Sequence, residues 1–254
     1  MAEVVIVPTA VEGGEIAASM IAALVTSRED AVLGLATGST PLTTWSALAA
    51  RSLDLARVRG FALDEYVGLP PEHPESYRAV ITREVVEPLG LTPALVRVPG
   101  DDGSVQGAGE RYESAIVAVG GVDLQVLGIG RTGHIGFNEP GSSLASLTRV
   151  KTLTQQTRID NARFFDSVDD VPLHCITQGL GTILRARHLV LLAWGSAKAA
   201  AIASALEGPV SASTPGSAVQ LHPHVTVIVD EEAAAQLAHA DYYRYAWENR
   251  HLVE

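Results

Sequence analysis

The sequence predicts a three-layer α/β fold, with a mostly parallel central sheet and helices on both faces. Short apolar runs of strand length recur along the chain. Segments with helical spacing separate most of them, which is the alternation expected of parallel strands joined by crossover helices. The chain has 254 residues, of which 47% are hydrophobic and 19% charged, so it can bury a large core. We therefore expect a Rossmann-like arrangement within one domain spanning residues 1–254.

The expected strands are apolar runs that end at polar or glycine-containing turns: residues 4–7, 31–36, 58–63, 96–98, 124–127, 188–193 and 225–229. The expected helices have apolar residues at helical spacing: residues 13–25, 41–50, 74–88, 104–119, 173–185, 198–206 and 231–240. Pro41 favours a helix start at its position. In the third interval between strands, the expected helix 74–88 has Tyr77, Val80, Ile81 and Val85 on one side. Residues 153–171 are polar and weakly periodic, which predicts a mobile flap.

Composition excludes several classes of partner. The formal charge of −11 argues against non-specific binding to nucleic acid or to an anionic membrane. An anionic substrate would therefore need a local cationic site. Cys175 is the only cysteine, so no intrachain disulfide can form and a reducing compartment fits. No charged-then-apolar leader is visible, and no uninterrupted apolar stretch reaches about 18 residues. We expect a cytoplasmic protein.

The segment DLQVLGIGRTGHIGFNEPGS, residues 123–142, is the most informative part of the chain. The apolar run of residues 124–127 is followed by a glycine-rich loop that carries His134 and Glu139. Open α/β sheets bind their ligands at the carboxyl ends of their strands. Histidine titrates near neutral pH and suits proton transfer, and a carboxylate five residues later could hold its tautomer.

Two other interpretations of this loop stay open. His134 could be a packed loop histidine without a chemical role. The segment GIGRTG also matches the GxGxxG dinucleotide fingerprint. That fingerprint needs a helix directly after it and an acid about 20 residues on. Here Gly136, Pro140 and Gly141 interrupt any helix, and no such acid follows a strand. The loop therefore does not predict a nucleotide cofactor.

Three further segments carry candidate chemistry. Residues 37–40, a Thr-Gly-Ser-Thr turn before Pro41, could cradle an anion with free N–H groups or be an ordinary βα turn. Asp64 and Glu65 follow an expected strand; because neighbouring strand residues point to opposite faces, only one should face a given pocket. Lys198 is one of only two lysines, and it follows Gly195 at an expected helix start, where it could meet a phosphate. Arg163 is a second candidate cation. His73 and Ser76, in the turn after Asp64 and Glu65, could line the same site as those acids.

Taken together, these segments resemble the glucosamine-6-phosphate deaminase family over about residues 4–232. The most specific pieces are LATGSTPLTTW, LDEYVGLPPEHPESY, GIGRTGHIGFNEP, TRVKTLT, NARFF, GSAKA and QLHPHVTVIVDE. Related sugar-phosphate lactonases share the fold and the early loops of this family, but they differ after the histidine. The HIGFNEP element is therefore the discriminating one.

The resemblance implies that glucosamine 6-phosphate and water become fructose 6-phosphate and ammonia, by ring opening, C2-to-C1 proton transfer and deamination. It implies that Asp64 is the base, that His134 opens the sugar ring and that Glu139 is its carboxylate partner. Thr132 stands where the family commonly carries Asp or Asn, and Thr can hydrogen-bond but brings no charge. The matching substrate-binding positions, with the phosphate held mainly by the last two and the turn, are Thr37, Gly38, Ser39, Thr40, Arg163 and Lys198. No metal, flavin or pyridoxal is implied.

Some members of that family are regulated by N-acetylglucosamine 6-phosphate at subunit contacts of a hexamer. The positions matching that allosteric site are Ser142, Ser143, Arg149, Lys151, Thr152 and Tyr243. Regulation would imply a homo-oligomer. The alternatives are a deaminase or isomerase for another amino-sugar phosphate such as galactosamine 6-phosphate, a 6-phosphogluconolactonase of the same fold, and a non-catalytic sugar-phosphate sensor.

Overall fold

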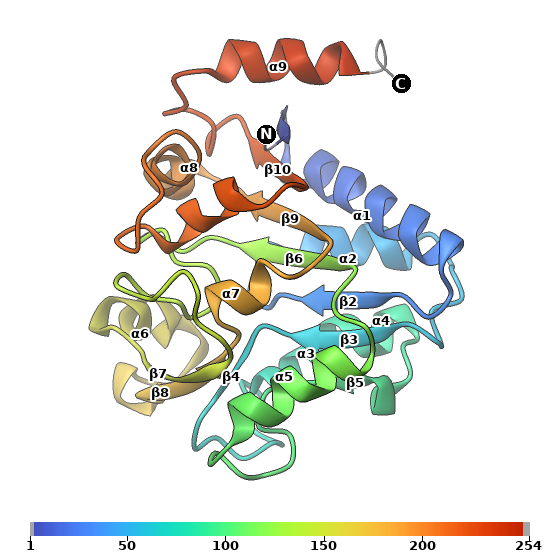
Figure 1. The fold of residues 1–254 in the computed structure, drawn as a ribbon, viewed down its shortest axis with the longest axis vertical. Coiled ribbons are helices and arrows are strands. Elements are labelled where there is room, and N and C mark those ends of the chain that lie inside the picture. Colours follow the sequence, from blue (N-terminus) through green and yellow to red (C-terminus); the bar gives the residue numbers. More distant parts are fainter. Residues whose placement is uncertain (1–2, 251–254) are drawn as a thin grey trace.

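Seven parallel strands form the central sheet of the computed structural model, which describes residues 3–250. The strand order is β1-β10-β9-β6-β2-β3-β5 (Figure 1). The strands are β1 Glu3–Val7, β2 Val32–Leu35, β3 Arg59–Ala62, β5 Val96–Arg97, β6 Leu124–Gly128, β9 His188–Ala193 and β10 Val225–Asp230. These strands occupy the seven apolar runs that the sequence predicted, and every pairing between them is parallel. The expected fold class is confirmed.

A second, antiparallel sheet of three strands was not predicted. Its order is β4-β8-β7, with β4 Asp64–Tyr66, β7 Arg149–Thr152 and β8 His174–Thr177. The central strand β8 pairs Thr177 with both Asp64 and Arg149. The helix expected over residues 173–185 is therefore wrong in its first half, and only α7, Leu180–Ile183, is helical. Pairing with two strands distant in the sequence decides the conformation of β8.

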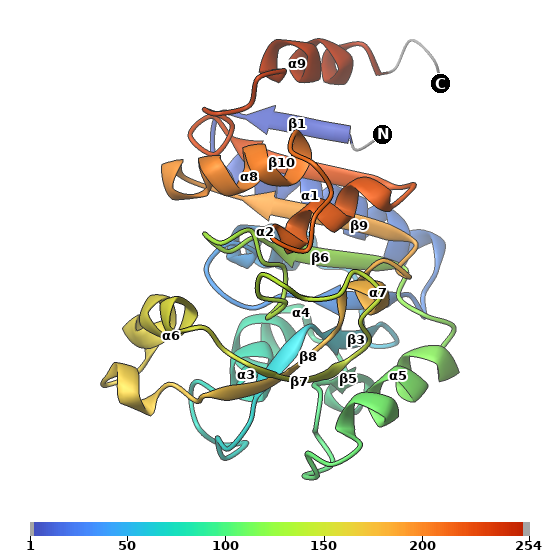
Figure 2. The same cartoon turned by 60° about the vertical axis from the view of Figure 1, so that its left-hand side comes forward.

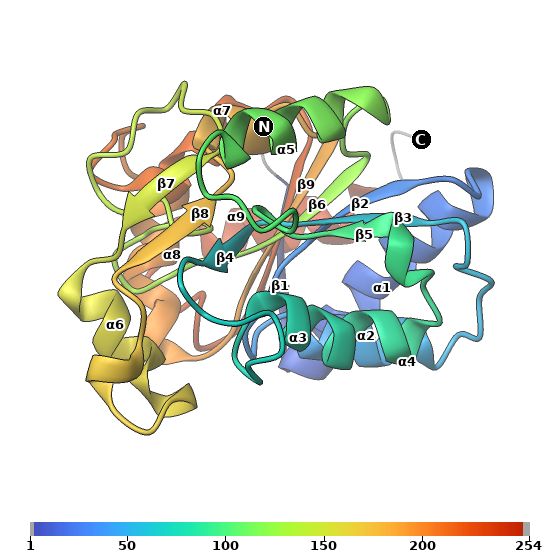
Figure 3. The ribbon, with the colours of Figure 1, turned by 90° about the horizontal axis from the view of Figure 1, so that it is seen from below.

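Helices cover both faces of the central sheet. Figure 3 shows α1, α2, α3 and α4 on one face and α5 and α7 on the other. Their bounds are α1 Ala10–Ser27, α2 Leu42–Ala49, α3 Tyr77–Ile81, α4 Glu87–Leu89 and α5 Ala108–Ala118. A π-helical turn, Thr82–Val86, joins α3 to α4, so the helix expected over residues 74–88 is one winding with a local expansion. The later helices are α6 Gln155–Asn161, α8 Ala199–Leu206 and α9 Ala240–Glu248.

The helix expected over residues 231–240 is wrong. The chain forms turns there, and α9 begins only at Ala240. Side-chain carboxylates take the backbone donors of this segment: Asp230 accepts from the N–H of Ala233, and Glu207 accepts from the N–H groups of Ala238 and His239. These bonds, one local and two from the distant Glu207, offer the backbone an alternative to a helix, although the composition of the segment favours one.

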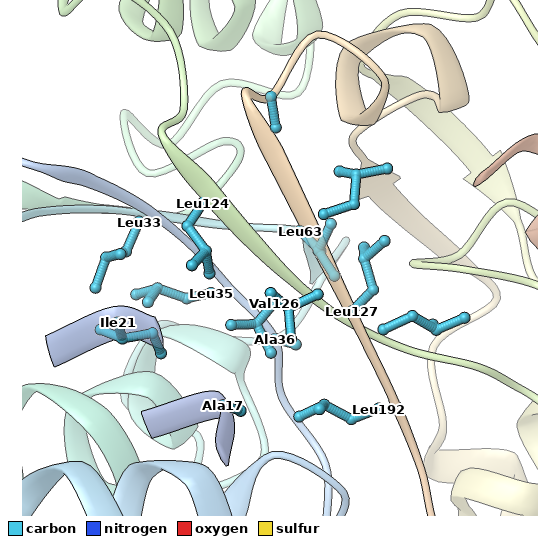
Figure 4. Packing of buried hydrophobic residues seen from close by; sticks show 14 of the residues in the cluster. Ala17, Ile21, Leu33, Leu35, Ala36, Leu63, Leu124, Val126, Leu127 and Leu192 are labelled. Carbon is cyan, nitrogen blue, oxygen red and sulfur yellow. The ribbon is translucent and has the colours of Figure 1, made fainter. Parts of the chain in front are cut away.

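The main core lies between the sheet and its helices. Figure 4 shows Ala17 and Ile21 of α1 packed towards Leu35 of β2 and Val126 of β6. All four side chains are almost fully buried. Among the described helices α1 has the length and apolarity of a membrane span, but it packs against α2 and β10 within the protein. We therefore interpret α1 as a core helix.

Four neighbouring strands, β9, β6, β2 and β3, are parallel, so their carboxyl ends lie together at the same end of the strands (Figure 2). The chain leaves β2 towards β3 on one side, whereas β6 is followed by β9 on the other. The gap between such diverging connections is where open α/β sheets bind ligands. The segments that follow these four strands contain residues 37–40, His134 and Lys198, and Asp64 at the start of β4.

Candidate active site

A cavity of about 570 Å³ opens at the carboxyl ends of these four strands. Its walls come from the loops after β2, β3, β6 and β9 and from α6 with the turn that follows it. The predicted site residues that line it are Thr37, Gly38, Ser39, Thr40, Asp64, His134, Arg163 and Lys198. Thr132 and Glu139 do not line the cavity, but both lie against His134. The fold thus brings the expected catalytic and phosphate-binding residues together.

His134 is held by two oxygens at the same ring nitrogen. Its Nδ1 lies 2.8 Å from the Thr132 hydroxyl and 3.5 Å from Glu139 Oε2. A proton on Nδ1 would face both oxygens and leave Nε2 as the basic nitrogen. The ring lies so close to Gly130 that an added Cβ there would come within 2.1 Å of it. Glycine at position 130 is therefore needed to make room for the imidazole.

Glu139 is buried, and its two oxygens have separate partners. Oε1 accepts hydrogen bonds from the hydroxyls of Thr154 and Thr157, at the start of α6, whereas Oε2 is the oxygen that faces His134. Burial alone would raise the pKa of Glu139. The interactions with His134 and Thr157 outweigh burial and hold this pKa at about 2. Glu139 is therefore an anion at neutral pH and can orient the imidazole.

Asp64 is the most perturbed carboxyl group of the cavity. It is 5% exposed, and burial, followed by repulsion from Glu65, raises its pKa to about 8. Hydrogen bonds from the Phe137 N–H and the Thr177 hydroxyl only partly oppose this shift. The loop of His134 reaches Asp64 through Gly136, whose φ is +53° and where an added Cβ would lie 3.4 Å from Asp64 Oδ2. A basic carboxylate thus lies in the same cavity as the histidine, as proton-transfer sites require.

Glu65 points away from the cavity. Its carboxylate accepts the backbone N–H groups of Tyr66, Tyr77 and Arg78 and so caps the start of α3. The prediction that only one of the two adjacent acids faces the pocket is confirmed, and that acid is Asp64. Ser76 is the N-cap of α3 and His73 stacks on Phe165, so neither lines the cavity.

The cavity also holds positively charged side chains. Lys198 Nζ donates to the Ile129 carbonyl at 2.6 Å. Burial, followed by the positive charges of Arg131 and Arg163, lowers the pKa of Lys198. Arg163 stacks over Phe164 at 4.6 Å. The turn of residues 37–40 lines the same cavity, and Gly38 within it has a φ of +88°. Cations beside open backbone turns are suited to a phosphate.

The residues matched to an effector site do not all meet in one chain. Ser142 donates to the Glu139 carbonyl, and Arg149 donates to Asn138 Oδ1 at 2.7 Å. Lys151 and Thr152 follow on β7, and Ser143 precedes it. Tyr243 lies on α9, beside β1 at the far edge of the central sheet, where its hydroxyl donates to Glu207 (Figures 1 and 2).

Sequence reasoning missed several residues of the cavity. Arg131 lines it, one residue before the Thr132 that was singled out. An aromatic wall also lines it: Tyr66, Tyr77, Phe137 and Phe165. Asn161 joins this wall by donating to the Tyr66 hydroxyl at 2.9 Å. The motif LDEYVGLPPEHPESY holds the two tyrosines: Tyr66 lies on β4 with Asp64, and Tyr77 on α3 packs its ring 4.9 Å from that of Tyr66.

No group of three or more His, Cys, Asp or Glu side chains is placed to hold a metal ion within residues 3–250.

Comparison with known proteins places this chain in a family. The model of glucosamine-6-phosphate isomerases/6-phosphogluconolactonase matches residues 9–228. The glucosamine-6-phosphate deaminase of Bifidobacterium longum is 60% identical, with 98% of each chain covered. That of Streptomyces avermitilis is also 60% identical, with 96% of each chain covered.

Solved structures agree with this placement. A structure described as a monomeric glucosamine-6-phosphate deaminase superposes with a TM-score of 0.89 at 41% identity, covering 93% of this chain and 100% of the other. The 6-phosphogluconolactonase of Trypanosoma cruzi, at 20% identity and a TM-score of 0.75, shares the fold, with 94% of this chain and 97% of the other covered. By its sequence, its fold and the arrangement of its cavity, this chain belongs to the glucosamine-6-phosphate isomerase/6-phosphogluconolactonase family.

Proposed function

We propose that this chain converts glucosamine 6-phosphate and water to fructose 6-phosphate and ammonia. The observation that carries this proposal is that one cavity holds a buried carboxyl group of raised pKa, Asp64, and a histidine, His134, that lies against Glu139. The same cavity is lined by the cations Arg163 and Lys198. Relatives that are 55–60% identical over 96–98% of this chain carry the name of that activity, which supports the same reaction here.

Ring opening is the step we assign to His134. The imidazole accepts the proton of the sugar's O1 hydroxyl, the C1–O5 bond breaks as the C1 carbonyl forms, and the ring oxygen O5 takes up a proton. Glu139 and Thr132 hold the imidazole at Nδ1, which keeps the other nitrogen available for this transfer. An imidazole can both accept and donate a proton, so His134 can pass the proton that it takes from O1 to O5.

Proton transfer between carbons is the step we assign to Asp64. The carboxylate removes the C2 proton, which is acidified by the neighbouring carbonyl at C1, and returns it to C1. The C1 oxygen takes up the proton that the ammonium group loses, so that C1 becomes a hydroxymethyl carbon and C2 an iminium carbon. The iminium adds water, and cleavage of the C–N bond gives the ketone and ammonia. Burial makes Asp64 a stronger base than an exposed carboxylate, as this abstraction requires. Arg163, Lys198 and the turn of residues 37–40 hold the phosphate and so orient C1 and C2.

Ammonia release from a panel of sugar phosphates tests this proposal. We expect rapid release from glucosamine 6-phosphate, little from galactosamine 6-phosphate, and none from glucosamine without a phosphate. Preferential release from galactosamine 6-phosphate would favour the alternative substrate. Hydrolysis of 6-phosphogluconolactone without ammonia release would identify a lactonase. Binding of the amino-sugar phosphate without turnover would indicate a sensor, a class that needs no base at Asp64.

Regulation is a separate proposal. N-acetylglucosamine 6-phosphate would bind beside β7, where Arg149 and Lys151 supply cations. Because Tyr243 lies at the far edge of the sheet, only Tyr243 of another copy could complete that site, so the proposal requires a homo-oligomer. One solved relative is described as a monomeric glucosamine-6-phosphate deaminase, so assembly into an oligomer is not general in the family. A cytoplasmic location remains a prediction, and it fits the single buried, free thiol of Cys175.

A further inference from the structure

Arg131 is a cavity residue for which the mechanism above has no use. It lies in the loop after β6, is exposed, and lines the same cavity as Arg163 and Lys198. We propose that Arg131 is a third cation of the phosphate subsite and that the three charges together select a dianionic ester over a monoanionic one. This inference rests on the proposed function, because it assigns the charge of the substrate group bound at that site.

The backbone that carries Arg131 is fixed on both sides. The Gly133 N–H donates to the Gly130 carbonyl at 3.0 Å, which closes a tight turn with Arg131 and Thr132 at its centre. The Gly130 N–H donates to the His134 carbonyl, and the Gly216 N–H donates to the Gly133 carbonyl at 2.6 Å. Gly133 has a φ of +76°, which favours glycine. The turn therefore presents Arg131 to the cavity from a defined position, while Thr132 contacts His134.

The three cations act on one another and have no carboxylate partner. The positive charges of Arg131 and Arg163 both lower the pKa of Lys198, after the larger effect of burial. Within residues 3–250, none of the three makes an ion pair with Asp or Glu. Asp160 lines the same cavity and offsets only part of their effect on Lys198. The net charge of the chain is −11, so three neighbouring cations without an ion-pair partner, Arg131, Arg163 and Lys198, indicate a binding site for an anion.

A phosphate monoester matches this arrangement better than a monoanion. It carries a charge of about −1.5 to −2 at pH 7 and three acceptor oxygens. An arginine offers its donors in a planar fork that can bind two of those oxygens at once, whereas Lys198 acts as a point charge. A sulfate ester has the same three-oxygen shape but one negative charge. Removal of one cation should therefore weaken phosphate binding more than sulfate binding.

The experiment compares wild type with Arg131→Gln and Arg131→Lys. The matched control is Arg57→Ala, since Arg57 is exposed and pairs only with Glu29 at the surface. We expect Arg131→Gln to raise KM for glucosamine 6-phosphate by about tenfold or more with little change in kcat, because a contact made equally in ground and transition states appears in KM. The dissociation constant of inorganic phosphate, measured by calorimetry, should rise in parallel. Arg131→Lys should recover part of both losses.

The charge selection is tested with glucosamine 6-sulfate as a competitive inhibitor. We expect the ratio of sulfate-ester to phosphate-ester dissociation constants to fall in Arg131→Gln and to stay unchanged in Arg57→Ala. Equal phosphate affinity in wild type and Arg131→Gln would overturn the inference. A wild-type protein that binds phosphate through Arg131 but releases no ammonia would overturn the proposed function and leave the role of Arg131 intact.

Discussion

At the scale of single residues, the cavity separates two carboxyl groups by their surroundings. Burial and Glu65 raise the pKa of Asp64 to about 8, whereas His134 and Thr157 outweigh burial and hold the pKa of Glu139 at about 2. When the surroundings separate the pKa values of two acids in one site, the two acids take different roles in the reaction. Asp64 is suited to carry a proton, and Glu139 is suited to remain an anion behind the histidine.

Replacement of the proposed base should separate binding from chemistry. Asp64→Asn keeps the shape of the side chain but cannot accept the C2 proton, so we expect turnover to be abolished. Affinity for a substrate analogue should stay within about tenfold of wild type. The measurement is solvent-deuterium uptake at C1 of the product. Uptake that persists in the variant would exclude Asp64 as the base.

The pH dependence of kcat/KM should report the same residue. A base must be deprotonated, so kcat/KM should rise with pH until it passes the free-enzyme pKa of Asp64, about 8. Because Glu65 contributes to that raised pKa, Glu65→Gln should move the acidic limb to lower pH. Glu110→Gln, at an exposed position on α5, is the control. A limb that stays in place in Glu65→Gln would show that another group controls it.

The two oxygens at His134 Nδ1 should differ in importance. Thr132 is the nearer at 2.8 Å but is neutral, whereas Glu139 at 3.5 Å carries the charge. We expect Glu139→Gln to lower kcat by about 10²-fold or more, as when a triad loses its orienting acid. Thr132→Val should stay within about tenfold, the effect of a neutral hydrogen bond. Steady-state kinetics of the two variants at one pH measure both effects. A larger loss of kcat in Thr132→Val than in Glu139→Gln would reassign the orienting role to Thr132.

At the scale of elements, α6 lies within the segment predicted to be a flap and is attached to Glu139. Thr154 is the N-cap of α6, and its hydroxyl, together with the buried hydroxyl of Thr157, donates to Glu139 Oε1. The other oxygen of Glu139 faces His134. The Glu139 side chain therefore connects α6 to the imidazole of His134, so that movement of α6 would change the orientation of the imidazole.

Loss of that attachment should loosen the flap and slow the reaction together. We expect Thr157→Val to increase hydrogen exchange in residues 155–161 and to lower kcat/KM severalfold, since a buried acceptor loses a partner at a cost of about 1–3 kcal/mol. Gln156→Ala, on the exposed side of α6, is the matched control. Faster exchange with unchanged kcat/KM would separate the flap from catalysis.

At the scale of the whole molecule, acid should weaken the fold at the edge opposite the cavity. The rings of His188 and His224 stack at 3.7 Å, and burial, followed by the charges of His224 and His222, lowers the pKa of His188 to about 4. A lowered histidine pKa gives stability that is full above pH 6.5 and is lost as the pH falls towards 4. The loss should be on the order of 1–2 kcal/mol after solvent screening.

Urea unfolding at pH 7 and pH 5 measures this loss. We expect the free energy of unfolding of wild type to fall between these pH values, and His188→Gln to fall by less because it cannot take up the proton. His239→Gln, outside the stacked pair, should behave as wild type. Equal losses in wild type and His188→Gln would mean that other groups cause the acid sensitivity.

Subunit association and regulation should appear together or not at all. If Lys151 and a Tyr243 from another copy form an effector site, N-acetylglucosamine 6-phosphate should lower the apparent KM, with a coupling of about 1–3 kcal/mol, and Lys151→Ala should erase the response. Light scattering gives the assembly state in the same buffer. A monomer with hyperbolic kinetics that ignores the effector would make this an unregulated member of the family.

The sequence by itself determined the parallel sheet and much of the candidate site. Apolar runs mark the seven strands of the main sheet because buried parallel strands are apolar on both faces, a pattern that needs no knowledge of their neighbours. The glycine-rich loop of His134 and the turn of residues 37–40 were visible for a similar reason, since tight backbone turns demand particular residues. Both lie, as expected, at the carboxyl ends of strands.

Tertiary structure alone decided the rest. The conformation of β8 depends on β4 and β7, which are distant in the sequence, and the turns after β10 depend on carboxylates of Asp230 and Glu207. The strand pattern alone left open which of Asp64 and Glu65 faces the cavity, a choice that only the family resemblance made, and nothing in the sequence singled out Arg131 among sixteen arginines. Those choices depend on burial and on charges brought together from separate strands. A local pattern cannot encode such distances, because they are set only when the elements pack.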